Sequence, residues 1–145
     1  MGILGEKIKY DDLKDKGKKE IYNFQRVSAV FAEYGYSVTP IRDDAEFADF
    51  VAVPFIKDET TKPLWIQLKG GLTFGDKYKD KDLYICFPDW KNNAWYLYPH
   101  DQLYAELEDE LRKRAENWDK EHKYQHAPSF PAWAEERMKK YKIDQ

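Results

Sequence analysis

Asp49, Gln67 and Lys69 are the residues of this chain whose types and spacing best fit a chemical task. Gln67 and Lys69 lie two apart in the alternating run 64–69, so a strand there places both side chains on one face. Asp49 immediately precedes the apolar run 50–53, which reads as a buried strand. If these two runs are neighbouring strands of a hairpin, Asp49 approaches Gln67 and Lys69 across the sheet.

These residue types suit the hydrolysis of a phosphodiester bond. Asp49 supplies an anionic oxygen for a hard divalent cation, and the side chain of Gln67 and the backbone carbonyl of Leu68 supply neutral oxygens. Lys69 can orient or deprotonate an attacking water and stabilise charge on the phosphate. Each residue alone also has an ordinary interpretation, as a turn aspartate or as part of a solvated strand face.

The segment that comes before these residues has the spacing of a helix. Apolar side chains recur at three- and four-residue steps over 16–34, which predicts an amphipathic helix. Asp15 is suited to cap its first turn, and Gly35 is suited to end it.

Short strands are predicted on both sides of a glycine-rich connection. The connection contains Gly70, Gly71 and Gly75, and we expect it to be flexible. Asn92-Asn93 favours a hairpin turn between the last two strands. The predicted strands are 36–39, 50–53, 64–69, 83–87 and 95–98.

The remainder of the chain is predicted to be helical. Leu103, Leu107 and Leu111 fall four apart, and a proline-containing break at 128–131 precedes a last short helix over 132–141. The whole order predicts an α/β (α+β) fold, with a central mixed sheet of about five strands flanked by helices. The length of 145 residues suits one domain.

In chain order, Glu20, GYSV, Asp49, IQLK, YICF and WYLYP resemble the PD-(D/E)XK nuclease superfamily. The resemblance is to its small members with a QxK third strand, among restriction-type, junction-resolving and group I intron homing endonucleases. It covers about residues 15–103 and implies a restriction-endonuclease-like core of order αβββ-(α)-ββ-α. A C-terminal helical extension over about 104–145 has no counterpart in that resemblance.

The resemblance also assigns roles within the site. Asp49 takes the place of the motif aspartate, Gln67 the usually acidic position, Lys69 the motif lysine, and Glu20 the additional glutamate of many members. Ala48 stands where the motif has proline, and the neutral Gln67 removes one formal charge from the metal site. The implied ligands of Mg²⁺, which Mn²⁺ can replace, are Glu20, Asp49, Gln67 and the backbone carbonyl of Leu68.

The function that follows is a divalent-metal-dependent endonuclease acting on double-stranded or branched DNA. A basic segment after the glycines offers DNA contacts at Lys77, Tyr78, Lys79 and Lys81, with Tyr78 able to stack or wedge. A solvated loop explains the same lysines equally well. The alternative function is a catalytically inactive DNA-binding or assembly module of the same fold, and an RNA-directed nuclease is a third interpretation.

Composition bounds these expectations. The net charge of −3 argues mildly against nucleic acid, although lysines gather at 14–19 and again at 69–81. No apolar run is long enough for a membrane helix. Because Cys86 is the single cysteine, the chain cannot form an internal disulfide, and we expect Cys86 to be a core residue. A cytoplasmic location in a bacterium or a phage-infected cell is therefore expected. A chain this small would read a long palindromic site as a homodimer or homotetramer.

Two other clusters of side chains contain possible metal ligands. His122 and His126 have a helical metal-ligand spacing but no third ligand, so surface histidines are the simpler interpretation. Asp43, Asp44 and Glu46 either cap a turn or replace Asp49 as a ligand.

Overall fold

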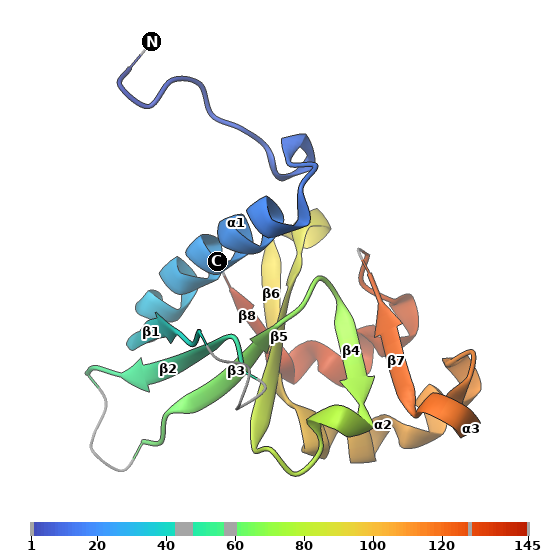
Figure 1. Cartoon of the computed structure of the whole chain (residues 1–145). Coiled ribbons are helices and arrows are strands. Elements are labelled where there is room, and N and C mark those ends of the chain that lie inside the picture. The colour runs from blue at the N-terminus through green and yellow to red at the C-terminus, as the bar shows by residue number, and fades with distance from the viewer. Residues whose placement is uncertain (1, 43–47, 57–60, 128, 145) are drawn as a thin grey trace.

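The structure is a computed structural model that describes residues 2–42, 48–56, 61–127 and 129–144. Its centre is a six-stranded mixed sheet in the order β1-β2-β3-β5-β6-β8 (Figure 1). β3 and β5 run parallel, whereas the other neighbours in this sheet are antiparallel. The strands are β1 (Tyr36–Pro40), β2 (Phe50–Pro54), β3 (Leu64–Leu68), β5 (Leu83–Asp89), β6 (Ala94–Pro99) and β8 (Lys142–Asp144). The predicted α+β class with a mixed sheet and flanking helices is therefore confirmed.

Helix α1 (Lys16–Glu33) covers one face of the sheet. The carboxylate of Asp15 accepts a hydrogen bond of 3.0 Å from the backbone N–H of Lys18, so the predicted N-cap is confirmed. Gly35 has φ 84° just beyond the helix, as its predicted role at the C-terminal end requires. The buried face of α1 packs on alternate strand residues, and this cluster comprises Val27, Val30, Phe31, Phe50, Ala52, Ile66, Cys86 and Trp95.

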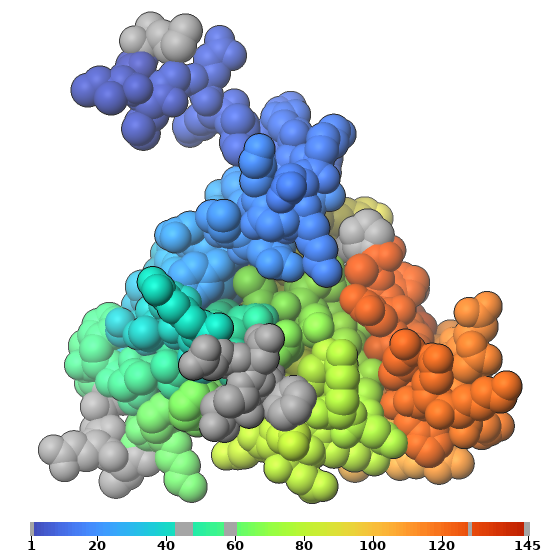
Figure 2. Space-filling model, viewed as in Figure 1, coloured from blue at the N-terminus to red at the C-terminus, as the bar shows by residue number. Residues whose placement is uncertain are grey.

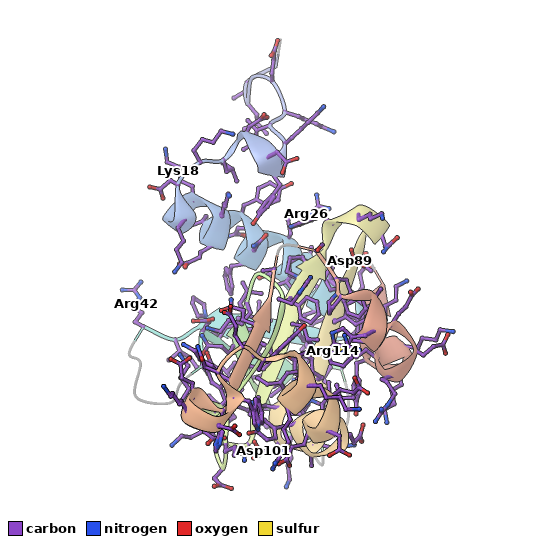
Figure 3. The ribbon with its side chains drawn as sticks, turned by 90° about the vertical axis from the view of Figure 1, so that its right-hand side faces the viewer. Lys18, Arg26, Arg42, Asp89, Asp101 and Arg114 are labelled. Carbon is purple, nitrogen blue, oxygen red and sulfur yellow. The ribbon has the colours of Figure 1, made fainter. Side chains whose placement is uncertain are left out.

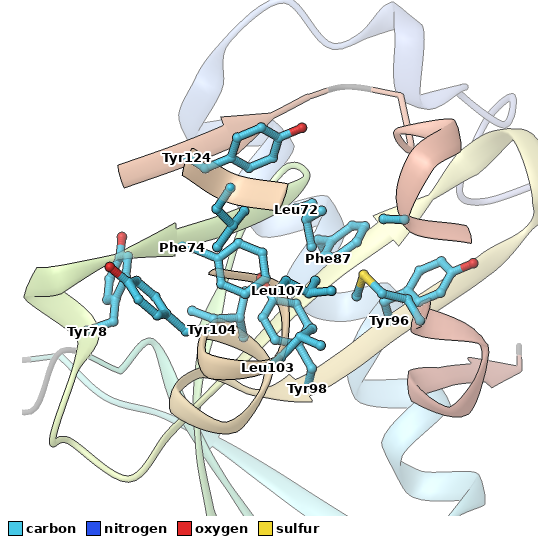
Figure 4. Packing of buried hydrophobic residues seen from close by; sticks show 14 of the residues in the cluster. Leu72, Phe74, Tyr78, Phe87, Tyr96, Tyr98, Leu103, Tyr104, Leu107 and Tyr124 are labelled. Carbon is cyan, nitrogen blue, oxygen red and sulfur yellow. The ribbon is translucent and has the colours of Figure 1, made fainter. Parts of the chain in front are cut away.

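Helix α2 (His100–Arg114) and the C-terminal segments cover the β5–β6 part of the other face. Leu103, Leu107 and Leu111 are buried there, as their four-residue spacing predicts. Aromatic side chains from β4, β5 and β6 complete this second cluster (Figure 4). The sheet therefore separates two apolar cores, one on each face.

The glycine-rich connection between β3 and β5 differs from its prediction. It contains a strand, β4 (Leu72–Gly75), and a short 3-10 helix, η3 (Asp76–Tyr78). β4 pairs antiparallel with β7 (Lys123–His126) in a separate two-stranded sheet. A Cβ on Gly71 would lie 2.0 Å from the carbonyl oxygen of His126, so only glycine fits where the two strands meet.

The expected C-terminal helical extension is helical only in part. After α2 the chain forms α3 (Trp118–Glu121), then β7, and it ends in β8, and neither of these strands was predicted. The predicted last helix over 132–141 is present as a continuous helical run of η5 (Ala132–Ala134), α4 (Glu135–Met138) and η6 (Lys139–Tyr141).

The N-terminal segment before η1 (Tyr10–Asp12) extends away from the body of the protein (Figures 1 and 2). Ile3 and Leu4 in this segment are almost fully exposed. η1 itself contacts the body, because the ring of Tyr10 lies 5.1 Å from that of Trp90, in the η4 turn (Trp90–Asn92) between β5 and β6. Among the described helices, none is long and apolar enough to cross a membrane.

Candidate functional site

The carboxylate of Asp49 reaches across to β3. Its Oδ2 accepts a hydrogen bond of 2.7 Å from the backbone N–H of Leu68. The backbone N–H of Asp49 in turn donates to the carbonyl oxygen of Ile66 at 2.8 Å. Because Phe50 pairs with Ile66 in the antiparallel register, Asp49 lies beside Gln67 where β2 begins and β3 ends. The structure thus brings Asp49 next to the QxK segment, as the sequence predicts.

Gln67 and Lys69 follow the alternation of β3. Ile66 belongs to the cluster under α1, so Gln67 points to the opposite face, where its neighbour on β5 is Ile85. Lys69 lies just beyond the strand, and its backbone N–H donates to the carbonyl oxygen of Cys86 at 2.8 Å. This bond extends the β3–β5 pairing by one residue and fixes the backbone at Lys69.

The face that carries these side chains is only partly exposed. Asp49 is exposed, whereas Gln67 and Lys69 are half-buried. Elsewhere on β2 and β3, Val53 is 42% exposed and Trp65 is 39% exposed. α2 and the C-terminal segments cover β5 and β6 on this face (Figure 1). The candidate site therefore lies at the border between the covered and the exposed parts of this face.

A groove of about 1060 Å³ lies elsewhere in the described part of the molecule, lined by β4, β7 and the segment around Trp133. Asp49, Gln67 and Lys69 do not line it.

Glu20 is exposed on α1, and the buried side of this helix packs on the sheet face opposite Gln67. Among the described residues there is no group of three or more acidic, histidine or cysteine side chains arranged to hold a metal ion. Asp43, Asp44 and Glu46, the alternative ligands, lie outside the described residues.

The predicted DNA-contact segment has its side chains in different environments. Lys77 and Lys81 are exposed, but Tyr78 is only 4% exposed and packs in the core. Lys79 forms an ion pair of 3.4 Å with Asp76, and its ammonium lies 4.1 Å from the centre of the Tyr104 ring. Stacking of Tyr78 on a base would require its ring to leave this packing.

The two lysine groups seen in the sequence do not form one basic surface. Lys18 of α1 and Asp101 lie at opposite ends of the molecule (Figure 3). Asp101 accepts a hydrogen bond of 2.9 Å from the backbone N–H of Asp80, so the segment that carries Lys79 and Lys81 belongs to the Asp101 end. Only the second group is thus available to the candidate site.

β4 is held by two buried side chains that the sequence did not single out. The hydroxyl of Tyr98 accepts from the backbone N–H of Thr73 at 3.0 Å and donates to its carbonyl oxygen at 2.6 Å. Nε2 of His100 accepts from the backbone N–H of Gly75 at 3.1 Å. The Tyr98 hydroxyl and the His100 imidazole thus form hydrogen bonds with backbone groups of β4 that are not bonded to β7. The signal in the sequence was the tyrosine alternation in WYLYPH, which reads equally well as ordinary core packing.

The tautomer of His100 follows from its partners. Since Nε2 accepts a hydrogen bond, Nδ1 carries the proton and donates to Asp101 Oδ1 at 2.8 Å. Burial lowers the pKa of His100 from its usual value of 6.5, although the neighbouring carboxylate of Asp101 opposes this shift.

Asp76 joins η3 to two distant helices. Its carboxylate accepts from the Tyr104 hydroxyl at 2.9 Å and lies 2.9 Å from Nδ1 of His122. Burial raises the pKa of this carboxyl, but the hydrogen bonds from His122 and Tyr104 and the charge of Lys79 outweigh it, so the pKa is lowered from 3.8. We interpret this cluster as the element that closes the end of the β4–β7 pair.

The other candidates have structural surroundings. His122 ends α3 with φ 44°, and His126 lies in β7 near the hydroxyl of Ser129, so the expected helix carrying both histidines is absent. Cys86 is fully buried, and burial raises the pKa of its thiol far above the usual value. A buried neutral thiol is consistent with its prediction as a core residue.

Comparisons with protein-family models, with curated proteins and with solved structures found no match. Function must therefore be argued from the geometry of the site.

Proposed function

We propose that this chain is a divalent-metal-dependent endonuclease that hydrolyses phosphodiester bonds in double-stranded or branched DNA. The observation that carries the proposal is the 2.7 Å hydrogen bond from the backbone N–H of Leu68 to the carboxylate of Asp49. It holds the exposed acidic group beside the segment that carries Gln67 and Lys69, on the face of the sheet opposite α1. An acid, an amide and an amine from adjacent strands then face one substrate.

The order of elements supports the same assignment. Along the chain, a helix is followed by three antiparallel strands, by a strand parallel to the third of them, and by that strand's antiparallel neighbour. These five strands have the same order in the sheet. This agrees with the order αβββ-(α)-ββ-α that the resemblance to PD-(D/E)XK nucleases implies, with β4 and η3 in place of the optional helix.

The oxygen donors at the site fit a hard cation. Asp49 offers a carboxylate, and Gln67 and the backbone of Leu68 offer carbonyl oxygens, a set that suits Mg²⁺ and is accepted by Mn²⁺. A divalent cation bound there would lower the pKa of a coordinated water and offset charge on the phosphate. We leave Glu20 out of this ligand set, because its helix covers the opposite face.

Lys69 supplies the remaining chemistry in this proposal. Its ammonium stands at the end of β3, where it orients the attacking water and stabilises the negative charge that develops on the phosphate. Asp49 and Lys69 come from neighbouring strands, so the register of the sheet sets their relative positions.

The test is incubation of the protein with supercoiled plasmid and with a synthetic four-way junction, in Mg²⁺, in Mn²⁺ and in EDTA. We expect metal-dependent cutting that falls at least about a hundredfold in Asp49→Ala and in Lys69→Ala. Lys62→Ala is the matched control, since Lys62 is an exposed lysine just before β3. Equal cutting by all four proteins would refute the assignment.

One observation favours a second function, that of a catalytically inactive DNA-binding or assembly module. Within the described residues, no group of three or more acidic, histidine or cysteine side chains is arranged to hold a metal ion, so Asp49 does not belong to such a cluster there. Calorimetric titration with Mg²⁺ or Mn²⁺ separates the two functions, because an inactive module gives no heat that depends on Asp49. Assembly into a homodimer or homotetramer stays a prediction, which sedimentation velocity can test. A cytoplasmic location also stays a prediction.

A further inference from the structure

The ring of Tyr78 is shared by two lysines, one of which belongs to the candidate site. The ammonium of Lys69 lies 5.3 Å from the centre of this ring, and that of Lys77 lies 5.0 Å from it. Both distances are within the range in which a cation is attracted to the electrons of an aromatic ring. Two flexible side chains from different elements therefore share the Tyr78 ring as a contact.

The ring itself is fixed by the fold. Tyr78 is 4% exposed, and its ring packs edge-on against the imidazole of His100, with centres 5.5 Å apart. His100 is fully buried and is held from two sides, by the backbone N–H of Gly75 and by Asp101. The start of α2 therefore packs against the Tyr78 ring and restricts where this ring lies.

The next lysine in the segment has a different arrangement. Lys79 is held by the carboxylate of Asp76 and lies over the ring of Tyr104. Tyr104 is as deeply buried as Tyr78 and carries the ammonium group of Lys79 on its ring. Each of these two rings thus contacts a lysine of the 77–79 segment.

We propose that Tyr78 is a positioning residue, which holds the ammonium groups of Lys69 and Lys77 together as a two-lysine site for a phosphate group. Tyr78 does not stack on a base in this assignment, and Lys77 acts beside Lys69 and not as a separate surface contact. A fixed ring reduces the conformational freedom that two long side chains would otherwise lose when substrate binds. The link to catalysis rests on the proposed nuclease function, whereas the arrangement of the lysines does not.

The arrangement is tested by NMR after reductive methylation of the lysines with ¹³C-formaldehyde. Lys69→Arg and Lys77→Arg assign the two methyl signals. We expect both signals to be displaced upfield by the ring current of Tyr78 and to show contacts with its ring protons. The displacement should persist in Tyr78→Phe and disappear in Tyr78→Leu.

Two further variants distinguish the loss of the Tyr78 ring from general unfolding. Phe31→Leu removes a similarly buried ring from the cluster under α1 and should leave the signals of Lys69 and Lys77 in place. Tyr78→Met fills more of the ring's volume and serves if the leucine variant fails to fold. If the wild-type signals show neither displacement nor ring contacts, Tyr78 does not position these lysines.

Phosphate binding is measured on the same samples by adding inorganic phosphate. We expect both signals to move together in the wild type, with binding several-fold weaker in Tyr78→Leu and unchanged in Phe31→Leu. Movement of only one signal, or of neither, would overturn the two-lysine phosphate site.

Cleavage assays then separate the two proposals. We expect the rate of plasmid cutting to fall about tenfold or more in Tyr78→Leu, because a misplaced group near the reacting atoms is costly, and to recover in Tyr78→Phe. If the NMR displacement is present but the wild type cuts no DNA, the nuclease function fails and the positioning role stands. If Tyr78→Leu cuts normally, Tyr78 has no positioning role in the reaction.

Discussion

The polar groups at the two ends of the segment between β3 and β5 differ in their burial and in their partners. In β4, the backbone groups of Thr73 and Gly75 are bound by the buried side chains of Tyr98 and His100. Where the same segment leaves β3, Lys69 is half-buried and lies next to an exposed Asp49. At the first end buried side chains bind the backbone, whereas at the second end the polar side chains are wholly or partly accessible to solvent.

This difference separates stability from function. A buried polar group without a partner costs free energy, so Tyr98 and His100 are required wherever β4 is to form. Exposed groups can be replaced at small cost to folding, which leaves them available for substrate. Changes at β4 should therefore act on stability, and changes at the end of β3 should act on cleavage.

The largest loss of stability is expected for Gly71→Ala. The added Cβ would lie 2.0 Å from the carbonyl oxygen of His126 and 2.9 Å from atoms of Ala127, so β4 and β7 must separate. We expect the free energy of unfolding to fall by about 3 kcal/mol in a urea titration. Gly70→Ala is the control, since its nearest new contact, with Ala127, is at 4.0 Å. Equal stability of the two variants would mean that β4 and β7 do not meet as described.

A smaller loss is expected for Tyr98→Phe. The variant keeps the ring but removes the hydroxyl that binds both backbone groups of Thr73. Leaving a buried N–H and C=O without a partner costs about 2 kcal/mol, measured as a shift in the urea midpoint. Tyr96→Phe on the same strand provides the comparison, and we expect it to change stability by less than about 0.5 kcal/mol. A neutral Tyr98→Phe would show that water replaces the hydroxyl at β4.

Local signals in the sequence predicted much of the fold. The first helix, its cap at Asp15 and its end at Gly35 depend on neighbouring residues, and all three are confirmed. β4 could not be predicted in this way, because four residues next to glycines carry a weak pattern. Its stability comes from β7 and from Tyr98 and His100, which lie far along the chain.

The candidate site was predictable to the same extent. Alternation and hairpin order were sufficient to place Asp49 beside Gln67. The position of Glu20 was not predictable, because helical spacing identifies the apolar side of a helix but not the sheet face that it covers. The burial of Tyr78 was also beyond the sequence, since it depends on contact with His100.

His100 makes the β4 region sensitive to pH. Burial lowers the pKa of its imidazole from 6.5, so the unfolded chain takes up a proton below pH 6.5 more readily than the folded chain. The stability that neutral His100 contributes is therefore present above pH 6.5 and is lost as the pH falls through the folded pKa. Urea titrations at pH 7.5 and 5.5 should show this loss, as an effect smaller than that of Tyr98→Phe. His100→Gln should reduce the pH dependence more than His126→Gln does.

The smallest effect on stability, together with a large effect on cleavage, is expected for Asp49→Asn. The amide oxygen of asparagine can still accept the hydrogen bond from the backbone N–H of Leu68, so the junction of β2 and β3 is kept. We expect a change in unfolding free energy below about 1 kcal/mol, and loss of metal-dependent cutting because the anionic ligand is gone. A loss of stability as large as that of Tyr98→Phe, with cutting retained, would make Asp49 a structural partner of β3. The end of β3 would then resemble β4 in its chemistry, and the contrast between the two ends of the segment would disappear.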